Sequence, residues 1–315
     1  MKNKYIKQTL AVLLLAFLWA AGSLYFFEQK GNDVKGALVF AESYNAGTKV
    51  DRIEVGNQQN KITLVLENGG WRVAEADYYY AHPGFVAALL EDLNQARFYR
   101  PQEKAPQPEK GWTSIKVFAG NKLLNSIEVG DKTPNQRYNY LKRDAQGVWL
   151  VEGKFQLPRR LYSWMQQPLT AFPPSLFEAV EIVENGESRQ AKRESELQEF
   201  LDAEGRHLKM TNLLQVFEFL NARGAQAAQN FDDSVHQKLR KIVLTTFSGM
   251  VITADLYQDA EKNYWLKLSF STTHLPTVYV NDYIKENSYL YEGWYFKISP
   301  EAGEKLALYD IDRDL

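Results

Sequence analysis

The chain has 315 residues, of which 45% are hydrophobic and 13% aromatic, and it carries a formal net charge of −2 at pH 7. This composition is typical of a globular protein and excludes an intrinsically disordered one. The slight acidity and the lack of a basic cluster argue against a nucleic-acid partner. Because the chain has no cysteine, thiol nucleophiles, thiolate metal sites and a lipoprotein anchor are excluded.

The N-terminal segment combines three lysines with an uncharged run over residues 9–27. At about 1.5 Å per residue, this run forms a helix of roughly 28 Å, close to the hydrocarbon thickness of a bilayer. We therefore expect a cytoplasmic segment at 1–8, a transmembrane helix at 9–27 and a periplasmic remainder, which predicts a single-pass protein of the bacterial inner membrane. A cleaved signal peptide is the alternative, because Ala20-Ala21-Gly22-Ser23 offers small residues at a cleavage position.

The next segment, 28–49, is rich in small and polar residues and is expected to be a linker. Residues 50–170 then alternate strand and helix patterns between turn signals, which predicts a first α+β repeat. The expected elements are strands at 50–55, 61–66, 71–73, 115–119, 123–129, 138–141 and 148–151, and helices at 85–98 and 159–167.

The second part of the chain, 171–315, repeats the first in outline. Strand, helix, paired strands and a further strand recur in the same order at a near-constant offset of about 127 residues, which favours an internal duplication. Unrelated α+β proteins with a similar element order are the alternative. The expected elements are strands at 182–183, 241–246, 250–257, 263–268 and 294–299, and helices at 194–201, 211–224 and 300–308.

The predicted fold class is therefore α+β, with an N-terminal transmembrane helix followed by two related halves of antiparallel strands packed with helices.

No motif of known chemistry stands out in the chain. The Gly-x-Ser-x-Gly elbow, a phosphate-binding glycine loop and metal-binding histidine spacings are all absent, so we predict no enzymatic activity, no nucleotide, no cofactor and no metal. The isolated histidines are His82, His207, His236 and His274. Asp310, Asp312 and Asp314 resemble the start of a calcium loop but lack its glycine and its distal glutamate. The pair Asp232 and Asp233 could serve a glycosidase, although such pairs are usually only hydrated.

Tyrosines are the more unusual signal, with 18 in the chain. Exposed tyrosines suit protein partners and also sugar rings, because the ring is apolar and its tip is polar. The competing interpretation is that each ring simply packs in the core. The residues predicted to contact a partner are Tyr78, Tyr79, Tyr80, Tyr289 and Tyr291.

Several short motifs together resemble the family called domain of unknown function 4340. These motifs are the N-terminal span, Val50-Asp51-Arg52-Ile53-Glu54-Val55, Gly70-Trp71-Arg72-Val73, the helix 85–98, Ser126-Ile127-Glu128-Val129-Gly130-Asp131 and Gly147-Val148-Trp149-Leu150-Val151. The chain departs from the family pattern at Lys110-Gly111-Trp112, where a Gly-Leu-x-x-Pro segment is common. The resemblance implies a membrane-anchored protein associated with auxiliary components of ABC transporters of the gliding-motility type, and it supplies no catalytic residues.

These observations predict a periplasmic accessory or scaffold protein. The expected partners are the inner membrane and an integral membrane protein such as a transporter permease, with no nucleic acid and no nucleotide. The alternative is an envelope glycan-binding module or hydrolase that uses the aromatic surface.

Overall fold

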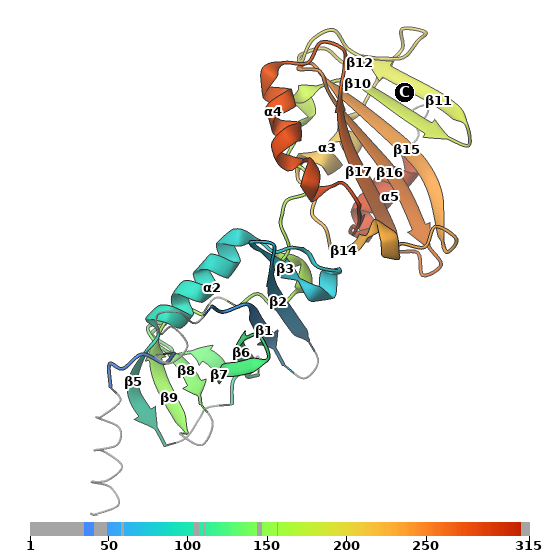
Figure 1. The fold of residues 1–315 in the computed structure, drawn as a ribbon. Helices are drawn as coiled ribbons and strands as arrows, with labels where there is room; N and C mark the ends of the chain where they lie inside the picture. Colours follow the sequence, from blue (N-terminus) through green and yellow to red (C-terminus); the bar gives the residue numbers. More distant parts are fainter. Residues whose placement is uncertain are drawn as a thin grey trace, which may run out of the picture. The chain divides into compact units, whose positions relative to one another are not determined.

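The structure is a computed structural model that describes residues 35–40, 49–57, 60–103, 107–109, 111–143, 147–155 and 157–309. The chain divides into two compact units, which are described one at a time. The first consists of Met1–Thr63 and Gly84–Leu157, and the second of Leu64–Pro83 and Pro158–Leu315. Figure 1 labels the elements of both.

The strands form two nine-stranded antiparallel sheets. The first sheet has the order β4-β3-β2-β1-β6-β7-β8-β9-β5. Its strands are β1 (Arg52–Gly56), β2 (Lys61–Glu67), β3 (Gly70–Val73), β4 (Tyr79–Tyr80), β5 (Arg97–Gln102), β6 (Thr113–Ala119), β7 (Lys122–Lys132), β8 (Asn139–Lys142) and β9 (Val148–Glu152). The second sheet has the order β13-β12-β11-β10-β15-β16-β17-β18-β14. Its strands are β10 (Phe177–Glu184), β11 (Glu187–Lys192), β12 (Phe200–Leu201), β13 (His207–Leu208), β14 (Gly224–Ala227), β15 (His236–Thr246), β16 (Met250–Asp259), β17 (Tyr264–Thr272) and β18 (Trp294–Lys297).

The two sheets have the same strand order. In each, a meander of four strands runs outward from a central strand, β1 or β10, and a helix then leads to the strand at the opposite edge, β5 or β14. The chain returns beside the central strand with β6 or β15 and completes the sheet with three further strands. This topology relates the two sheets strand by strand, whereas the domain boundaries predicted from the sequence stay predictions.

Alternation along the strands builds the core of the second unit. Ile242 and Leu244 on β15 and Ile252 and Leu256 on β16 are buried, while the residues between them face the other side of the sheet. A period of two places every second side chain on the same face, so one face of the sheet is apolar.

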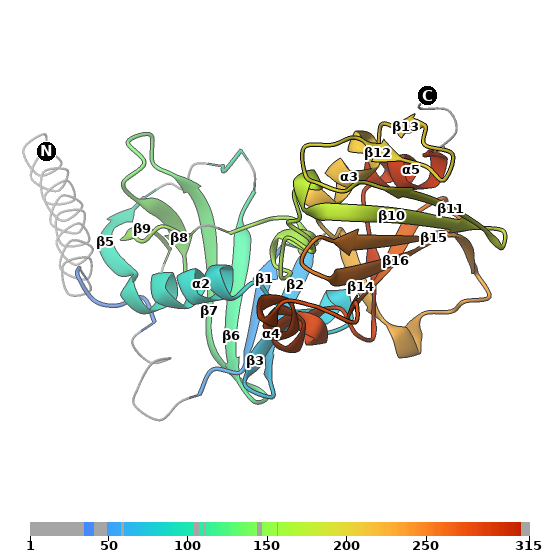
Figure 2. The same ribbon diagram turned by 90° about the horizontal axis from the view of Figure 1, so that it is seen from above.

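Helices pack on that apolar face. Gly303 of α5 lies so close to Tyr264 of β17 that a Cβ would stand 2.1 Å from the ring. Tyr283 of α4 contacts Phe270 of β17, with ring centroids 6.3 Å apart. The α-helices among the described residues are α2 (Pro83–Gln95), α3 (Thr211–Glu218), α4 (Val278–Asn287) and α5 (Pro300–Leu308). In Figure 2, α2 lies across strands of the first sheet.

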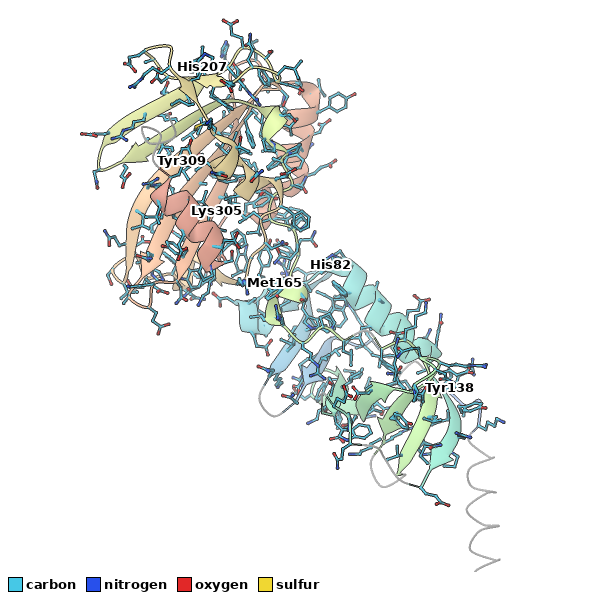
Figure 3. The ribbon with its side chains drawn as sticks, turned by 180° about the vertical axis from the view of Figure 1, so that it is seen from behind. His82, Tyr138, Met165, His207, Lys305 and Tyr309 are labelled. Atoms are coloured by element: carbon cyan, nitrogen blue, oxygen red, sulfur yellow. The ribbon has the colours of Figure 1, made fainter. Side chains whose placement is uncertain are left out.

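Hydrogen bonds at Tyr309 hold the C-terminal end of α5 in place in the second unit. Arg240 is buried, donates to the Tyr309 carbonyl at 2.7 Å and pairs with Glu184 at 2.7 Å. The Tyr309 hydroxyl donates to the carbonyl of Lys209 at 2.9 Å. Figure 3 labels Tyr309 just beyond the helix. The start of α5 matches the sequence prediction, because the Ser299 hydroxyl accepts a hydrogen bond from the third residue after it.

The predicted fold class is wrong in its balance of elements, because the structure is mostly two antiparallel sheets with few helices. The helix predicted at 159–167 is only a 3₁₀ turn over Leu161–Ser163. The helix predicted at 194–201 is a bend that leads into β12. Each of the two segments instead connects strands of the antiparallel sheets.

The predicted single-pass localisation in the inner membrane is also not supported. The longest described helix, α2, has 13 residues, whereas a span needs about 20. No helix among the residues that the structure describes is long and apolar enough to cross a bilayer. The predicted segments at 1–8 and 9–27 lie outside the described residues.

Part of the predicted linker at 28–49 belongs to the first unit. Val39 and Phe40 are buried, and the backbone nitrogen of Val39 donates to the Ala96 carbonyl at 2.8 Å. Leu38 bridges to Arg97 at the start of β5. This segment therefore covers the outer edge of the first sheet, which sequence reasoning missed because its apolar stretch is only five residues long.

Candidate functional site

The face of the second sheet opposite the helices is called here the open face. It carries Val243 and Thr245 on β15 and Thr253 and Asp255 on β16, all only partly buried. Their neighbours along the strands point into the apolar core, so the alternation that builds the core also fixes which side chains meet solvent.

A hollow of about 420 Å³ lies at one end of the open face. Its floor is formed by strands β10 and β15, and Glu181 beside it accepts a hydrogen bond from the Ser188 hydroxyl at 2.6 Å. Polar backbone and side-chain groups line the hollow together with two exposed apolar residues, Phe247 and Leu275. The hollow therefore has a polar floor and an apolar border.

That border belongs to a larger group of exposed apolar side chains, which we call the apolar rim. Three separate segments supply it, namely the turn before β10, the β15–β16 turn and the loop that enters α4. The side chains of these residues are between 37% and 86% exposed. The rim consists of Leu176, Phe247, Leu275, Val278 and Tyr279.

Backbone hydrogen bonds hold the three segments of the rim together. The Phe247 nitrogen donates to the Leu176 carbonyl at 3.1 Å, which joins the first two segments. The Thr273 nitrogen donates to the Gly249 carbonyl at 2.9 Å, and the Thr277 nitrogen donates to the carbonyl of the residue before Gly249 at 3.0 Å. The rim is therefore positioned by the scaffold and is not a set of independent loop tips.

Gly249 makes this arrangement possible. Its φ of +88° is one that side-chain-bearing residues rarely adopt, and a Cβ there would lie 2.9 Å from the Pro276 Cα. A glycine is thus required both by the turn between β15 and β16 and by the close approach of the loop that carries Leu275.

Helix α4 orients the rest of the rim. Val280 is buried, and Tyr283 packs against Phe172 with ring centroids 5.9 Å apart. Val278 and Tyr279 come from the first turn of the same helix, and both are among the most exposed apolar residues described. Contiguous exposed apolar surface of this kind is typical of protein–protein contact sites.

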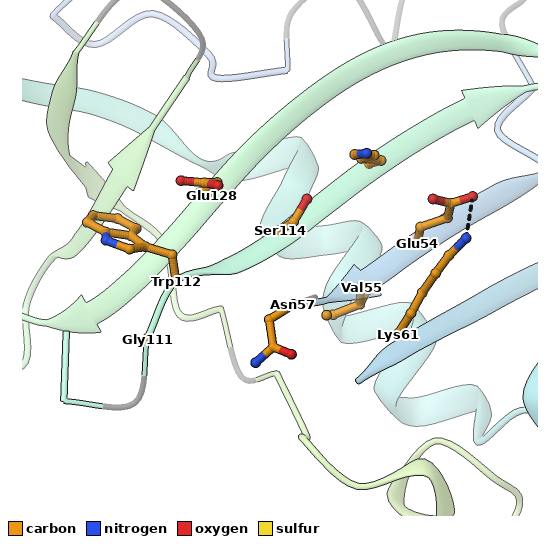
Figure 4. Close-up of a pocket in the computed structure, with 10 residues that line it drawn as sticks. Glu54, Val55, Asn57, Lys61, Gly111, Trp112, Ser114 and Glu128 are labelled. Atoms are coloured by element: carbon orange, nitrogen blue, oxygen red, sulfur yellow. Dashed lines mark ion pairs between the residues drawn. The ribbon is translucent and has the colours of Figure 1, made fainter. Parts of the chain in front are cut away.

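The first unit has a hollow of its own, of about 600 Å³, on the face formed by β1, β6 and β7 (Figure 4). Gly56, Ser114 and Glu128 are direct cross-strand neighbours, and the small first two leave space above the sheet. Gly56 has a φ of +149°, and a Cβ there would meet the Asn60 carbonyl at 2.0 Å. The hollow therefore follows from the hairpin that joins β1 to β2.

Ion pairs occupy most of the charged groups around this first hollow. Glu54 lies 3.1 Å from the Lys61 ammonium, and Glu128 lies 3.6 Å from that of Lys142. Lys142 also stands 3.9 Å from the centre of the Trp112 ring, so one face of that ring is covered. A sugar stacked on Trp112 would have to displace this lysine from that face.

The five tyrosines predicted to contact a partner divide into two groups. Tyr78 and Tyr289 are exposed by 47% and 50%, and Tyr80 is partly buried. Tyr79 and Tyr291 are buried, and burial raises the pKa of both above the usual tyrosine range. The sequence alone does not show which of these tyrosines are buried. Adjacent tyrosines on a strand face opposite sides, and the sequence does not show which side is the core.

The exposed tyrosines rest on the buried ones. Tyr79 packs edge-to-face against Tyr80 and against Trp294, with centroids 5.6 and 5.0 Å apart, and Tyr80 meets Tyr289 at 4.9 Å. Buried rings under an exposed ring restrict its rotamers, which lowers the entropy lost on binding. Tyr80 and Tyr289 thus form a second aromatic group at the surface of this unit.

The acidic pair singled out from the sequence lies apart from both hollows. Asp232 accepts two hydrogen bonds from Ser234, which lower the pKa of its carboxyl and hold its own turn. Asp232 and Asp233 line neither hollow. Over the described part of the chain, no three His, Cys, Asp or Glu side chains are grouped as metal ligands.

The four histidines lie in different strands and loops. His207 Nδ1 lies 2.7 Å from a Glu199 carboxylate oxygen, and His236 Nδ1 lies 2.7 Å from the Asp232 carbonyl oxygen. His274 lines the second-unit hollow, and the backbone nitrogen of His82 donates to the Trp164 carbonyl at 2.7 Å. The acidic stretch from Asp310 to Asp314 lies outside the described residues.

Sequence reasoning missed the apolar rim. The sequence signal for the rim is weak, because Phe247 precedes the turn glycine Gly249 and Leu275 precedes a proline. Each looks like an ordinary turn or loop residue until the fold brings them together.

A comparison with known protein families shows which family the chain belongs to. The family model for the domain of unknown function 4340 matches residues 71–262, more than half of the chain. The chain belongs to the domain of unknown function 4340 family. No curated protein and no solved structure matches the chain. The region matched by the domain of unknown function 4340 contains the floor of the second-unit hollow and Phe247, and it ends before Leu275 and Val278.

Proposed function

We propose that this member of the domain of unknown function 4340 family is a non-enzymatic accessory protein that binds a protein partner through the apolar rim. The observation that carries the proposal is the convergence of the rim residues, supplied by three segments, beside the hollow. Leaving large apolar side chains in water is unfavourable by about 25 cal/mol per Å² relative to burying them, and a partner would recover that free energy.

The composition of the rim supports a protein partner more than a small ligand. Aromatic side chains such as Phe247 and Tyr279 beside a shallow hollow are typical of the centre of a protein interface, where a partner side chain fills the depression. Tyr78 and Tyr289 add aromatic surface in the same unit. The proposal includes the transport-accessory role, with an integral membrane protein such as a transporter permease as the partner.

The glycan-binding or hydrolytic alternative has no comparable support. Its acidic pair, Asp232 and Asp233, lines neither hollow, and one face of the Trp112 ring is covered by Lys142. We therefore do not develop this alternative into a second candidate function.

A paired variant tests the proposal. Leu275→Glu combined with Val278→Glu places two charges in the rim, and we expect the tagged full chain to lose the partner that copurifies with the unchanged protein. Leu197→Glu is the matched control, because Leu197 is 98% exposed in the same unit and lies outside the rim. Retention of the same partner by the rim variant at unchanged yield would contradict the proposed function.

A further inference from the structure

A group of lysines lies on the open face beyond the hollow. Lys241 on β15 and Lys267 on β17 are the cross-strand neighbours of Asp255, which stands between them on β16. In the next row, Lys238 neighbours Tyr257, and on the far side Trp265 neighbours Lys297. The lysine patch consists of Lys238, Lys241, Lys267 and Lys297.

A β-bulge gathers the lysines of β15. The register shifts between Lys238 and Arg240, so that Lys238 and Lys241 face the same side although they are three residues apart. The Lys238 ammonium then reaches the Asp255 carboxylate at 2.8 Å. Without the extra residue, one of the two lysines would point into the core.

Aromatic rings fix the positions of the ammonium groups. Lys238, Lys267 and Lys297 stand 5.9, 5.3 and 5.9 Å from the ring centres of Tyr257, Tyr295 and Trp265. A cation at this distance from an aromatic face is attracted by the ring quadrupole. The lysine side chains are therefore partly ordered before any ligand arrives, which reduces the entropy lost on binding.

Phe231, which comes from the loop before β15, packs against the same rings. Phe231 stacks on Tyr295 with centroids 3.6 Å apart and also contacts Tyr257 and Trp265, both at 5.7 Å. Nucleic-acid bases and sugars bind such surfaces by stacking on free ring faces. Because Phe231 already packs on these rings, the patch offers a ligand its charges more than its ring faces.

The patch has an excess of positive charge. Its two rows contain four lysines and one aspartate, Asp255, which forms its ion pair with Lys238. At the edge of the patch, the Asp259 carboxylate accepts a hydrogen bond from the Trp265 indole at 3.1 Å. Within the described residues, Lys241, Lys267 and Lys297 are left without an ion pair. In a chain whose net charge is −2, this concentration of uncompensated cations favours an acidic ligand.

The patch and the hollow lie on one continuous face. Lys241 precedes Thr245 by four residues along β15, which corresponds to about 13 Å at about 3.3 Å per residue. Glu178, Glu181 and Lys192 stand at the hollow end, while Lys241, Lys267 and Lys297 stand at the other. An extended segment with an apolar residue at one end and acidic residues about four positions away fits this arrangement.

We propose that the lysine patch binds an acidic segment of the protein partner whose apolar residue occupies the hollow beside the apolar rim. This inference rests on the proposed function and names the chemistry of the partner. It commits to carboxylates on a peptide, because the patch offers ammonium groups without an ion pair, whereas Phe231 already packs against its rings.

Fluorescence anisotropy with three synthetic peptides and the full chain tests the inference. The probe is a labelled twelve-residue peptide that carries two leucines followed, four positions on, by four glutamates. One comparison peptide has glutamine for glutamate, and the other has serine for leucine. We expect the first peptide to bind best and its affinity to fall as salt is raised.

The variant Lys241→Glu with Lys267→Glu should weaken binding of the acidic peptide about tenfold and remove most of the salt dependence. Lys209→Glu is the control, because Lys209 is an exposed lysine just before α3 and outside the open face. Equal binding of the glutamine peptide, or an unchanged affinity in the double variant, would overturn the inference. Preferential binding of heparin or oligothymidylate, lost in the same variant, would overturn it too by assigning the patch to a glycan or a nucleic acid.

The design separates the inference from the proposed function. If the leucines matter and the glutamates do not, the inference fails and the rim proposal stands. If Leu275→Glu with Val278→Glu leaves peptide binding unchanged, the proposed function fails. Unfolding curves of every variant show whether a loss of binding reflects a loss of fold.

Discussion

Replacing Gly249 by alanine should loosen the apolar rim, because this glycine joins two of its segments. Its φ is +88°, and a Cβ would lie 2.7 Å from the Thr273 hydroxyl, 2.9 Å from the Pro276 Cα and 3.2 Å from the Leu275 carbonyl. The hydroxyl can rotate away, but the two backbone atoms cannot move without displacing the loop. The substitution should therefore act on both stability and the geometry of the rim.

The magnitude follows from two terms. An L-residue in the left-handed region costs about 1–2 kcal/mol, partly offset by about 0.4–1 kcal/mol because alanine restricts the unfolded chain. Forcing a methyl group into a packed site adds about 1–3 kcal/mol. We expect the free energy of unfolding to fall by about 2–4 kcal/mol in Gly249→Ala.

Gly186→Ala is the matched control. Gly186 has a φ of +85° in the turn between β10 and β11, and no atom lies within 4 Å of the position of its Cβ. That variant carries only the backbone strain, so it should lose about 1 kcal/mol. The difference between the two variants measures the crowding at Gly249.

Urea denaturation and amide hydrogen exchange provide the assay. The amides of Thr273 and Thr277 donate across the loop to Gly249 and Ser248, and both should exchange faster in Gly249→Ala but not in Gly186→Ala. If the two variants lose equal stability and both amides stay protected, the reasoning about the close approach is refuted.

Two further predictions concern buried tyrosines. The Tyr291 hydroxyl donates to the Leu169 carbonyl at 2.8 Å, so Tyr291→Phe should cost about 1 kcal/mol of unfolding free energy in urea denaturation, and an unchanged midpoint would refute the bond. Because burial raises the pKa of Tyr79 and Tyr291, the unfolded chain loses these protons at lower pH than the folded one. Their contribution to stability is therefore fully present below about pH 10 and falls as the pH rises above it. Denaturation between pH 8 and 11, with Tyr79→Phe and Tyr291→Phe combined as the comparison, should show a steeper alkaline loss for the unchanged protein, and parallel pH profiles would contradict this.

The central strands of both sheets are readable from the sequence because local composition and turn signals determine them. Residues 115–119 and 241–246 are short runs rich in β-branched and aromatic residues, each followed by a turn signal with glycine, and each forms a strand of the expected sheet. Ser299 before a proline likewise marks the start of α5, since a serine at this position accepts a backbone hydrogen bond. These predictions succeed because the residues that determine each element are neighbours in the sequence.

Predictions fail where distant residues decide the structure. The segment at 278–287 is a helix, although no helix is predicted there from the sequence. Its packing against Phe172 and Phe270 stabilises the helix, and neither residue is near in sequence. Tertiary contacts of this kind override local propensity.

The candidate site was the least predictable part for the same reason. Leu176, Phe247 and Leu275 come together only because β10, β15 and the loop before α4 meet at one end of a sheet. No spacing rule connects residues that are about 70 and 30 positions apart. The tyrosines were recognisable as unusual, but their burial depends on strand register that composition does not encode.

The most direct test of the proposed function is site-specific photo-crosslinking in cells of the source organism. A photoreactive phenylalanine analogue at position 275 should crosslink to one protein partner, while the same analogue at position 197 should not. Mass spectrometry of the adduct would identify the partner, and an acidic stretch about four residues from the crosslinked site would also support the further inference. A full yield of folded protein without any adduct at 275, or equal adducts at both positions, would contradict partner binding at the apolar rim.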